Sequence, residues 1–257
     1  MVVLAALHFP SIENLIEWPA FFFEDSEIFA FNKIALIHFI SLVIPFLLFF
    51  VAGRQQSLVP TGTRNFIESS VQFIERSIIM QTIGPDGLRY LPFLCTLFFF
   101  IFFGNIFEIV PFFHMPAHAR MGGPMVYGIL TLIMFVAVGV KHHGAGYFKE
   151  TLFPPGVRKA IYILVTPIEA LSVFIIRPFS LAVRLFANLL AGHILLVTFG
   201  VLCIALWQAG PLAVVLAGTY PMLVILTGFE VAVSLLQAFV FTILAAVYIG
   251  GALHPAH

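Results

Sequence analysis

Charged side chains are scarce in this chain, and their scarcity excludes most classes of protein. Only 9% of the 257 residues are Asp, Glu, Lys or Arg, whereas 61% are hydrophobic. The 12 basic and 12 acidic residues cancel, so the sequence shows no basic surface for a nucleic acid. A water-soluble domain needs more polar surface than this composition offers. With a mean hydropathy of +1.08, the chain is predicted to be an all-α polytopic membrane protein.

Cysteine is also nearly absent. Cys95 and Cys203 both lie in apolar stretches, which indicates small buried hydrophobic side chains rather than a disulfide. The first residues lack the positive charges of a secretory signal and lead into an acidic stretch, so no cleaved leader is expected. The sequence gives no reason to expect a metal site or any cofactor.

Apolar runs of bilayer length are the most prominent feature that is present. They predict three upright spans, at about residues 34–52, 91–110 and 125–140. Residues 1–32 mix aromatic with acidic side chains, which is typical of an interfacial segment. Residues 61–83 have apolar positions at helical spacing with charges between them, which indicates an amphipathic helix on the membrane surface.

Two longer apolar runs follow, at residues 161–206 and 211–253. The first would reach about 70 Å as one helix, which is over twice the apolar thickness of a bilayer. Each run is therefore either a broken helix or one arm of a steeply tilted, near-horizontal hairpin that turns at Gly210 and Pro211. The apolar flanks of Pro178 do not suit a water-exposed loop, so we favour the hairpin. All of residues 1–257 then form a single membrane domain.

The distribution of Lys and Arg predicts the orientation. Four Lys or Arg residues lie in residues 53–90 and four more in residues 141–160. Only Lys33 precedes them at the N-terminal end, and only Arg120 lies in residues 111–124. The first two connections are therefore expected on the cytoplasmic or matrix side, with the N-terminus opposite. Five crossings then return the C-terminus to the positive side.

Arg184 lies in the middle of the first long apolar run. An arginine at membrane depth costs roughly 2.5–3.5 kcal/mol on insertion scales, so it is rarely there for packing alone. Its guanidinium stays charged at any usable pH, repels cations and attracts a carboxylate. Asn188 is four residues further on and shares its helix face. Such a fixed charge suits a protein that moves protons on a carboxylate.

A second polar stripe lies on the other long run, where Glu230, Ser234 and Gln237 share one helix face. A hairpin would bring this stripe close to the region from Asn188 to His193. A carboxylate and an imidazole that exchange protons, lined by amides, are parts expected of an aqueous proton path.

Structural readings of these residues stay open at this point. Arg184 could form an internal ion pair with Glu169 or Glu230 that only holds the hairpin together. Glu230 and His193 could satisfy each other without proton traffic, and Asn188 and Gln237 could be interhelical hydrogen-bonding residues.

Other functional classes also remain. A respiratory-complex membrane subunit that binds quinone or haem is one alternative. Haem ligation would require histidines paired across spans, and only His38 and His193 lie deep. Another proton- or ion-conducting membrane protein is a further alternative, although a secondary transporter would show repeated halves, which this sequence lacks.

Residues 179–193 read FSLAVRLFANLLAGH, which resembles the signature of the ATP synthase subunit a family, the stator subunit beside the rotary c-ring. The resemblance extends to three other stretches, and together they cover most of residues 90–250: Thr96–Pro111, Gly144–Pro154 and Gly228–Tyr248.

The resemblance implies a proton-translocating stator subunit of a rotary ATP synthase, which forms no covalent bond itself and offers two offset half-channels to the c-ring. By position, Arg184 matches the arginine that faces the ring and separates the half-channels. Asn188 and Gln237 match its polar neighbours, and His193 with Glu230 matches the inlet pair. The remaining candidates are Glu169 for the opposite half-channel and Glu108 and Ser234 for the inlet, with His114 and His118 left open.

The implied partners are rotor subunits that carry a carboxylate, other F0 stator subunits, membrane lipids and protons, without any nucleic acid. The His193 and Glu230 arrangement favours the mitochondrial inner membrane, with a bacterial plasma membrane as the alternative.

Overall fold

The computed structural model describes residues 31–54, 59–110, 113, 115, 117–153, 161–207 and 210–254. This part of the chain is built from helices and contains no strand. All but the end of the predicted interfacial segment, residues 1–32, lies outside the described residues, as does His114. Within the described residues, five helical runs are long and apolar enough to cross a membrane, which confirms an all-α polytopic membrane protein: Lys33–Arg54, Pro85–Ile106, Gly122–His143, Tyr162–Trp207 and Ala213–Leu253.

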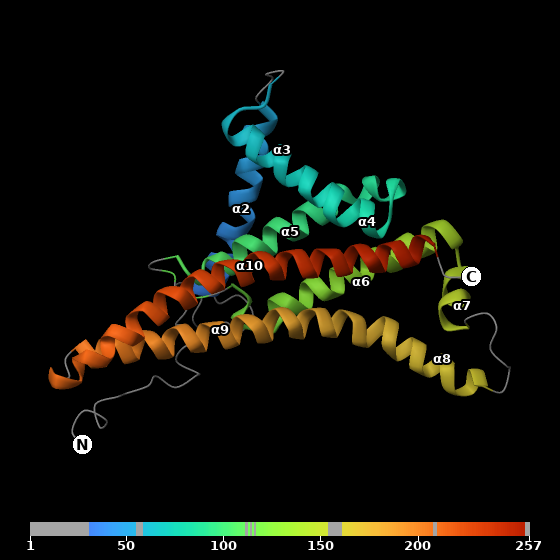
Figure 1. Cartoon of the computed structure of the whole chain (residues 1–257). Helices are drawn as coiled ribbons and strands as arrows, with labels where there is room; N and C mark the ends of the chain where they lie inside the picture. Colours follow the sequence, from blue (N-terminus) through green and yellow to red (C-terminus); the bar gives the residue numbers. More distant parts are fainter. Residues whose placement is uncertain are drawn as a thin grey trace.

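The two long runs form a hairpin (Figure 1). The first arm is continuous through α8 (Tyr162–Leu171), a π-helical turn η6 (Ser172–Ile176) and α9 (Arg177–Trp207). The second arm is α10 (Leu216–Leu253), which follows the short 3-10 helix η7 (Gly210–Val215). In Figure 1, α9 and α10 run side by side across the molecule, while α2 (Lys33–Arg54) rises away from them. Each long run is one continuous helical run in the part of the chain that the structure describes, so the alternative of two broken helices is wrong. Helices this much longer than the bilayer is thick must tilt steeply.

Three shorter elements support the hairpin. Helix α5 (Leu91–Ile106) packs along α10, and α6 (Gly122–His143) packs against both arms. Small residues allow the close contacts, since a Cβ on Gly128 would lie 2.5 Å from the carbonyl oxygen of Pro178. Ala245 and Ala246 of α10 are fully buried in the same core. Such small-residue contacts are how helices associate where lipid supplies no hydrophobic driving force.

The amphipathic segment is helical in three pieces: α3 (Gly62–Ile74), the π-helical turn η2 (Glu75–Ile79) and α4 (Met80–Thr82). Ile74, Ile78 and Ile79 are buried, while Arg64 and Glu68 approach to 4.0 Å on its outer side. The hydrophobic pattern of residues 61–83 does not predict the π-helical turn, because a one-residue widening of a helix has no distinct hydrophobic period. The short helices η3 (Pro85–Tyr90), η4 (Ala117–Ala119) and α7 (Gly146–Leu152) complete the described elements.

Helix α5 ends earlier than the sequence indicated. It stops at Ile106 rather than near Val110, and the amides of Glu108 and Ile109 instead donate to the carbonyls three residues back, at 3.1 Å. Glu108 therefore sits on a tight turn after the helix, where its side chain can point back into the bundle. The preceding apolar run gives no sign of this end, because its residues suit either a helix or a buried turn.

Candidate functional site

Arg184 lies on the outer face of the hairpin. It is exposed on α9 together with Ser180 and Asn188, whereas Leu181 and Leu185 on the opposite face are buried. No ion pair joins Arg184 to another residue of the described part of the chain, so the internal pairing with Glu169 or Glu230 does not occur here. The guanidinium is thus directed away from the described part of its own chain.

A buried acid–imidazole cluster lies further along the hairpin. Glu108, His193 and Glu230 are only 2%, 4% and 3% exposed. His193 Nδ1 lies 3.8 Å from Glu108 Oε1, and the carboxyl group of Glu230 packs directly over Gly192. Glu108 and Glu230 are close enough for their charges to interact. Three elements, the turn after α5, α9 and α10, thus bring together three groups that can each hold a proton.

Glu108 is the member of this cluster that sequence reasoning undervalued. The sequence pairs Glu230 with His193, and the structure adds the carboxylate of Glu108, which lies at ion-pair distance from His193. The available signal was an acidic residue immediately after an apolar span, which more often reaches water at the membrane surface. The residues around Glu108 do not predict the direction in which the turn folds back.

The polar stripe of α10 points inward. Glu230, Ser234 and Gln237 are all buried, and Ser234 is completely so. Among the described residues, Ser234 Oγ, Glu230 Oε2 and both carboxyl oxygens of Glu108 have no hydrogen-bond partner. A buried polar group without a partner is costly in a membrane protein, and an ordered water bound to each of these atoms would remove that cost. Carboxylates, an imidazole and water are sufficient to pass protons along the hairpin.

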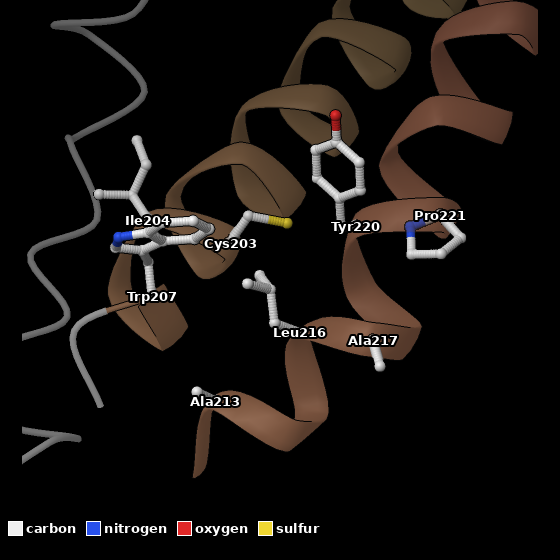
Figure 2. Close-up of a pocket in the computed structure, with 8 residues that line it drawn as sticks. All are labelled: Cys203, Ile204, Trp207, Ala213, Leu216, Ala217, Tyr220 and Pro221. Atoms are coloured by element: carbon white, nitrogen blue, oxygen red, sulfur yellow. The ribbon is translucent and has the colours of Figure 1, made fainter. Parts of the chain in front are cut away.

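A cavity of about 340 Å³ borders this cluster, with Glu108 and His193 in its wall and Thr227 on the α10 side. A larger cavity of about 620 Å³ lies at the hairpin tip, where Trp207 and Cys203 of α9 face Tyr220 of α10 (Figure 2). The tip cavity has neither a carboxylate nor an imidazole in its lining, so it offers no group that titrates near neutral pH. Of these two cavities, only the smaller has a carboxylate and an imidazole among its described lining residues.

Glu169 lies on α8, at the other end of the same helical run. It precedes Arg184 by fifteen residues, which is about 22 Å along a helix, while His193 follows Arg184 by nine, or about 13 Å. Arg184 therefore stands between Glu169 and the buried cluster, with proton-binding groups on either side.

The chain matches the family described as ATP synthase A chain over residues 35–250. It belongs to the ATP synthase subunit a family. Members of this family are the proton-translocating stator subunits of F0, and the match confirms what the motif at residues 179–193 indicated.

Curated relatives agree with the family. ATP synthase subunit a of Frankia alni is 39% identical over 229 residues, covering 88% of this chain and 79% of the relative. That of Rhodococcus erythropolis is 37% identical over 258 residues, covering 96% and 90%. That of Hyphomonas neptunium is 40% identical over 216 residues, covering 83% and 82%. These relatives are bacterial, so the expected mitochondrial location receives no support from them.

Gly192 provides a direct test of the buried cluster. Any side chain there would meet the carboxyl group of Glu230, so Gly192→Val should displace that carboxylate. We expect ATP-driven proton pumping in membrane vesicles to fall about ten- to hundredfold, since small misplacements of reacting groups have effects of this size. Gly218→Val on α10 is the matched control, because no atom lies within 4 Å of a Cβ at that position. Equal pumping by both variants would show that the placement of Glu230 does not matter.

Proposed function

We propose that this chain conducts protons to and from a c-ring through two offset half-channels, with Arg184 as the barrier between them. The observation that carries the proposal is the position of Arg184. It is an exposed permanent cation on the outer face of α9, with a buried acid–imidazole cluster on one side and Glu169 on the other.

The inlet begins at the cluster and follows α10 inward. Because α9 and α10 are antiparallel, the register that sets Glu230 over Gly192 brings Ser234 level with Asn188 and Gln237 level with the residues beside Arg184. The contact of Arg177 with the ring of Tyr248, at 5.3 Å, follows the same antiparallel order. Protons from the side poor in Lys and Arg would thus pass Glu108, His193 and Glu230 and reach the rotor carboxylate near Asn188.

The Arg184 guanidinium acts on the charge of that rotor carboxylate. It favours the ionised form and repels a proton that would cross directly from one half-channel to the other. Each elementary charge that crosses 100 mV releases roughly 2.3 kcal/mol, so the barrier has to exceed a few kcal/mol to prevent leakage. After nearly a full turn, the rotor carboxylate would release its proton toward Glu169.

The outer face of α9 is suited to a moving partner. Exposed Ser180, Ala187 and Ala191 surround Arg184 and Asn188 with small side chains. Small residues let neighbouring helices approach closely in a membrane. A ring of rotor helices could therefore come near the guanidinium without obstruction, while the other faces of the chain meet lipid and further F0 stator subunits. The bacterial relatives favour a bacterial plasma membrane over the mitochondrial inner membrane.

Cross-linking tests the proposed rotor contact. In a complex whose chain carries Cys95→Ala and Cys203→Ala, Ala187→Cys labelled with a photoreactive maleimide should capture a small rotor subunit, because this face is directed at the ring. Phe46→Cys is the control, since Phe46 is 66% exposed on α2, a helix that packs mainly against α5 and α3. Products would be identified by mass spectrometry of the purified complex. Capture from Phe46→Cys alone, or from neither position, would contradict the proposal.

A further inference from the structure

A second buried polar cluster lies outside the path described above. It consists of His38 of α2, Asn105 of α5, His118 of η4 and Tyr127 of α6. The His38 and His118 rings meet edge to face, with centroids 5.5 Å apart. His38 begins the second turn of α2 and Asn105 is near the end of α5, so the cluster lies on the side poor in Lys and Arg. This is the side from which protons enter in the proposed function.

His118 is held rigidly in this cluster. Its Nδ1 lies 2.6 Å from Asn105 Oδ1, and its Nε2 lies 2.9 Å from the Tyr127 hydroxyl. Burial, followed by the nearby His38, lowers the pKa of His118 well below its usual value, so the ring is neutral. The neutral ring donates from Nδ1 to Asn105 and accepts at Nε2 from Tyr127. With both nitrogens occupied, His118 fixes the orientation of the Asn105 amide and does not itself carry protons.

His38 and Asn105 each keep one polar atom unpartnered. His38 Nδ1 lies 2.9 Å from the Ile34 carbonyl oxygen and donates to it, which leaves the lone pair of Nε2 as an acceptor. Asn105 uses Oδ1 for His118 and keeps the two hydrogens of Nδ2 as donors. Neither His38 Nε2 nor Asn105 Nδ2 has a partner among the described residues, although both are buried. A Cβ on Gly123 would lie 2.9 Å from His38 Nε2, so this glycine keeps the approach to the nitrogen open.

His38 Nε2 and Asn105 Nδ2 belong to a larger set of buried polar atoms that have no hydrogen-bond partner among the described residues. In the described part of the chain, the buried side-chain atoms without a partner belong to His38, Asn105, Glu108, Glu230 and Ser234. Asn105 is in the last turn of α5, and Glu108 follows three residues later on the tight turn, with its amide donating to the Asn105 carbonyl oxygen, so the two side chains share a side. His118, which contacts both Asn105 and the ring of His38, then connects this turn to α2.

We propose that ordered water bridges His38 Nε2 and Asn105 Nδ2 in a small recess between them, and that His38 takes up protons from outside and passes them through this water to Glu108. This inference rests on the proposed function and adds an outer limb to its inlet. The Nε2 atom of neutral His38 binds one proton, and the same nitrogen then releases it to the recess water, so the ring returns to its starting state. His38 is five residues beyond Lys33, about 7.5 Å along the helix, so external water would have only a short distance to travel to reach it.

Water access to the recess can be measured on the assembled complex. In a chain with Cys95→Ala and Cys203→Ala, His38→Cys should react with a charged methanethiosulfonate reagent added from the proton-access side. We expect its labelling rate, followed by mass spectrometry, to be at least tenfold that of Phe39→Cys and Ile37→Cys. Phe39 is 57% exposed and Ile37 is completely buried. We expect neither position to meet water, so a thiol there should not ionise and should react slowly.

A second measurement separates proton transfer from packing. His38→Ala should lower the rate of ATP synthesis severalfold, and added imidazole should restore it, because the free base replaces the missing proton carrier in the recess. Ile37→Ala should show no such rescue.

An unreactive His38→Cys, or a His38→Ala variant that imidazole does not restore, would overturn the outer limb while leaving the proposed function intact. Coupled pumping by Arg184→Ala would instead reject the proposed function, whatever the labelling at residue 38.

Discussion

Replacing Arg184 with alanine is expected to abolish ATP-driven proton pumping while the complex still assembles. The side chain is exposed and has no ion pair within the described residues, so its loss should remove no internal contact, and alanine suits the middle of a helix. What disappears is the positive charge between the two proposed half-channels. If the barrier it supplies is a few kcal/mol, coupling should fall by about two orders of magnitude or more. Pumping would be followed by quenching of a pH-sensitive dye in inverted vesicles.

Arg177 provides the matched control for this experiment. It is the same residue type, seven positions earlier on the same helix, yet its guanidinium lies over the ring of Tyr248 at 5.3 Å. Arg177→Ala should therefore weaken packing between α9 and α10 and reduce pumping only severalfold. If Arg184→Ala pumps as well as Arg177→Ala, with equal amounts of assembled complex, then Arg184 is not the barrier.

The hairpin and its outer arginine could be predicted because both depend on local properties of the sequence. The length of an apolar run sets how far a helix reaches, and a run twice the bilayer thickness has to tilt or break. Spacing of three and four residues then puts Arg184 with Asn188, and Glu230 with Gln237, on common faces. The face of α10 that carries Glu230 packs inside the bundle, so Glu230 is buried. The face of α9 that carries Arg184 points outward, so Arg184 is exposed.

The partners of Glu108 and His118 could not be predicted in the same way. Each contact depends on where the chain returns after α5, and a turn that uses three-residue backbone bonds leaves no periodic signal. The bond from His118 to Asn105 crosses thirteen residues of mostly irregular chain. The hydrophobic pattern could show that these polar residues lie near a span end, but it could not distinguish a side chain that reaches water from one that folds back into the bundle.

The second large effect is expected for Glu230→Gln. Glutamine has nearly the same shape, so the contact with Gly192 and the helix packing should remain. The substitution removes the ability to bind and release a proton at the centre of the inlet, next to Glu108. Because positioned acids and bases contribute about a hundredfold or more to proton transfer, ATP synthesis driven by an imposed proton gradient should slow by at least about tenfold.

Thr242→Val tests whether this loss is specific to the proton path. Thr242 is also completely buried on α10, but its hydroxyl donates to the Ala238 carbonyl of its own helix at 2.7 Å, away from the unpartnered atoms near Glu230. Thr242→Val should therefore leave the synthesis rate close to that of the unmodified complex.

The slowing by Glu230→Gln should also be strongest when the proton-access side is alkaline, because scarce protons make the inlet rate-limiting. A Glu230→Gln rate that matches Thr242→Val at every pH would assign Glu230 to packing and move the inlet to Glu108 and His193 alone.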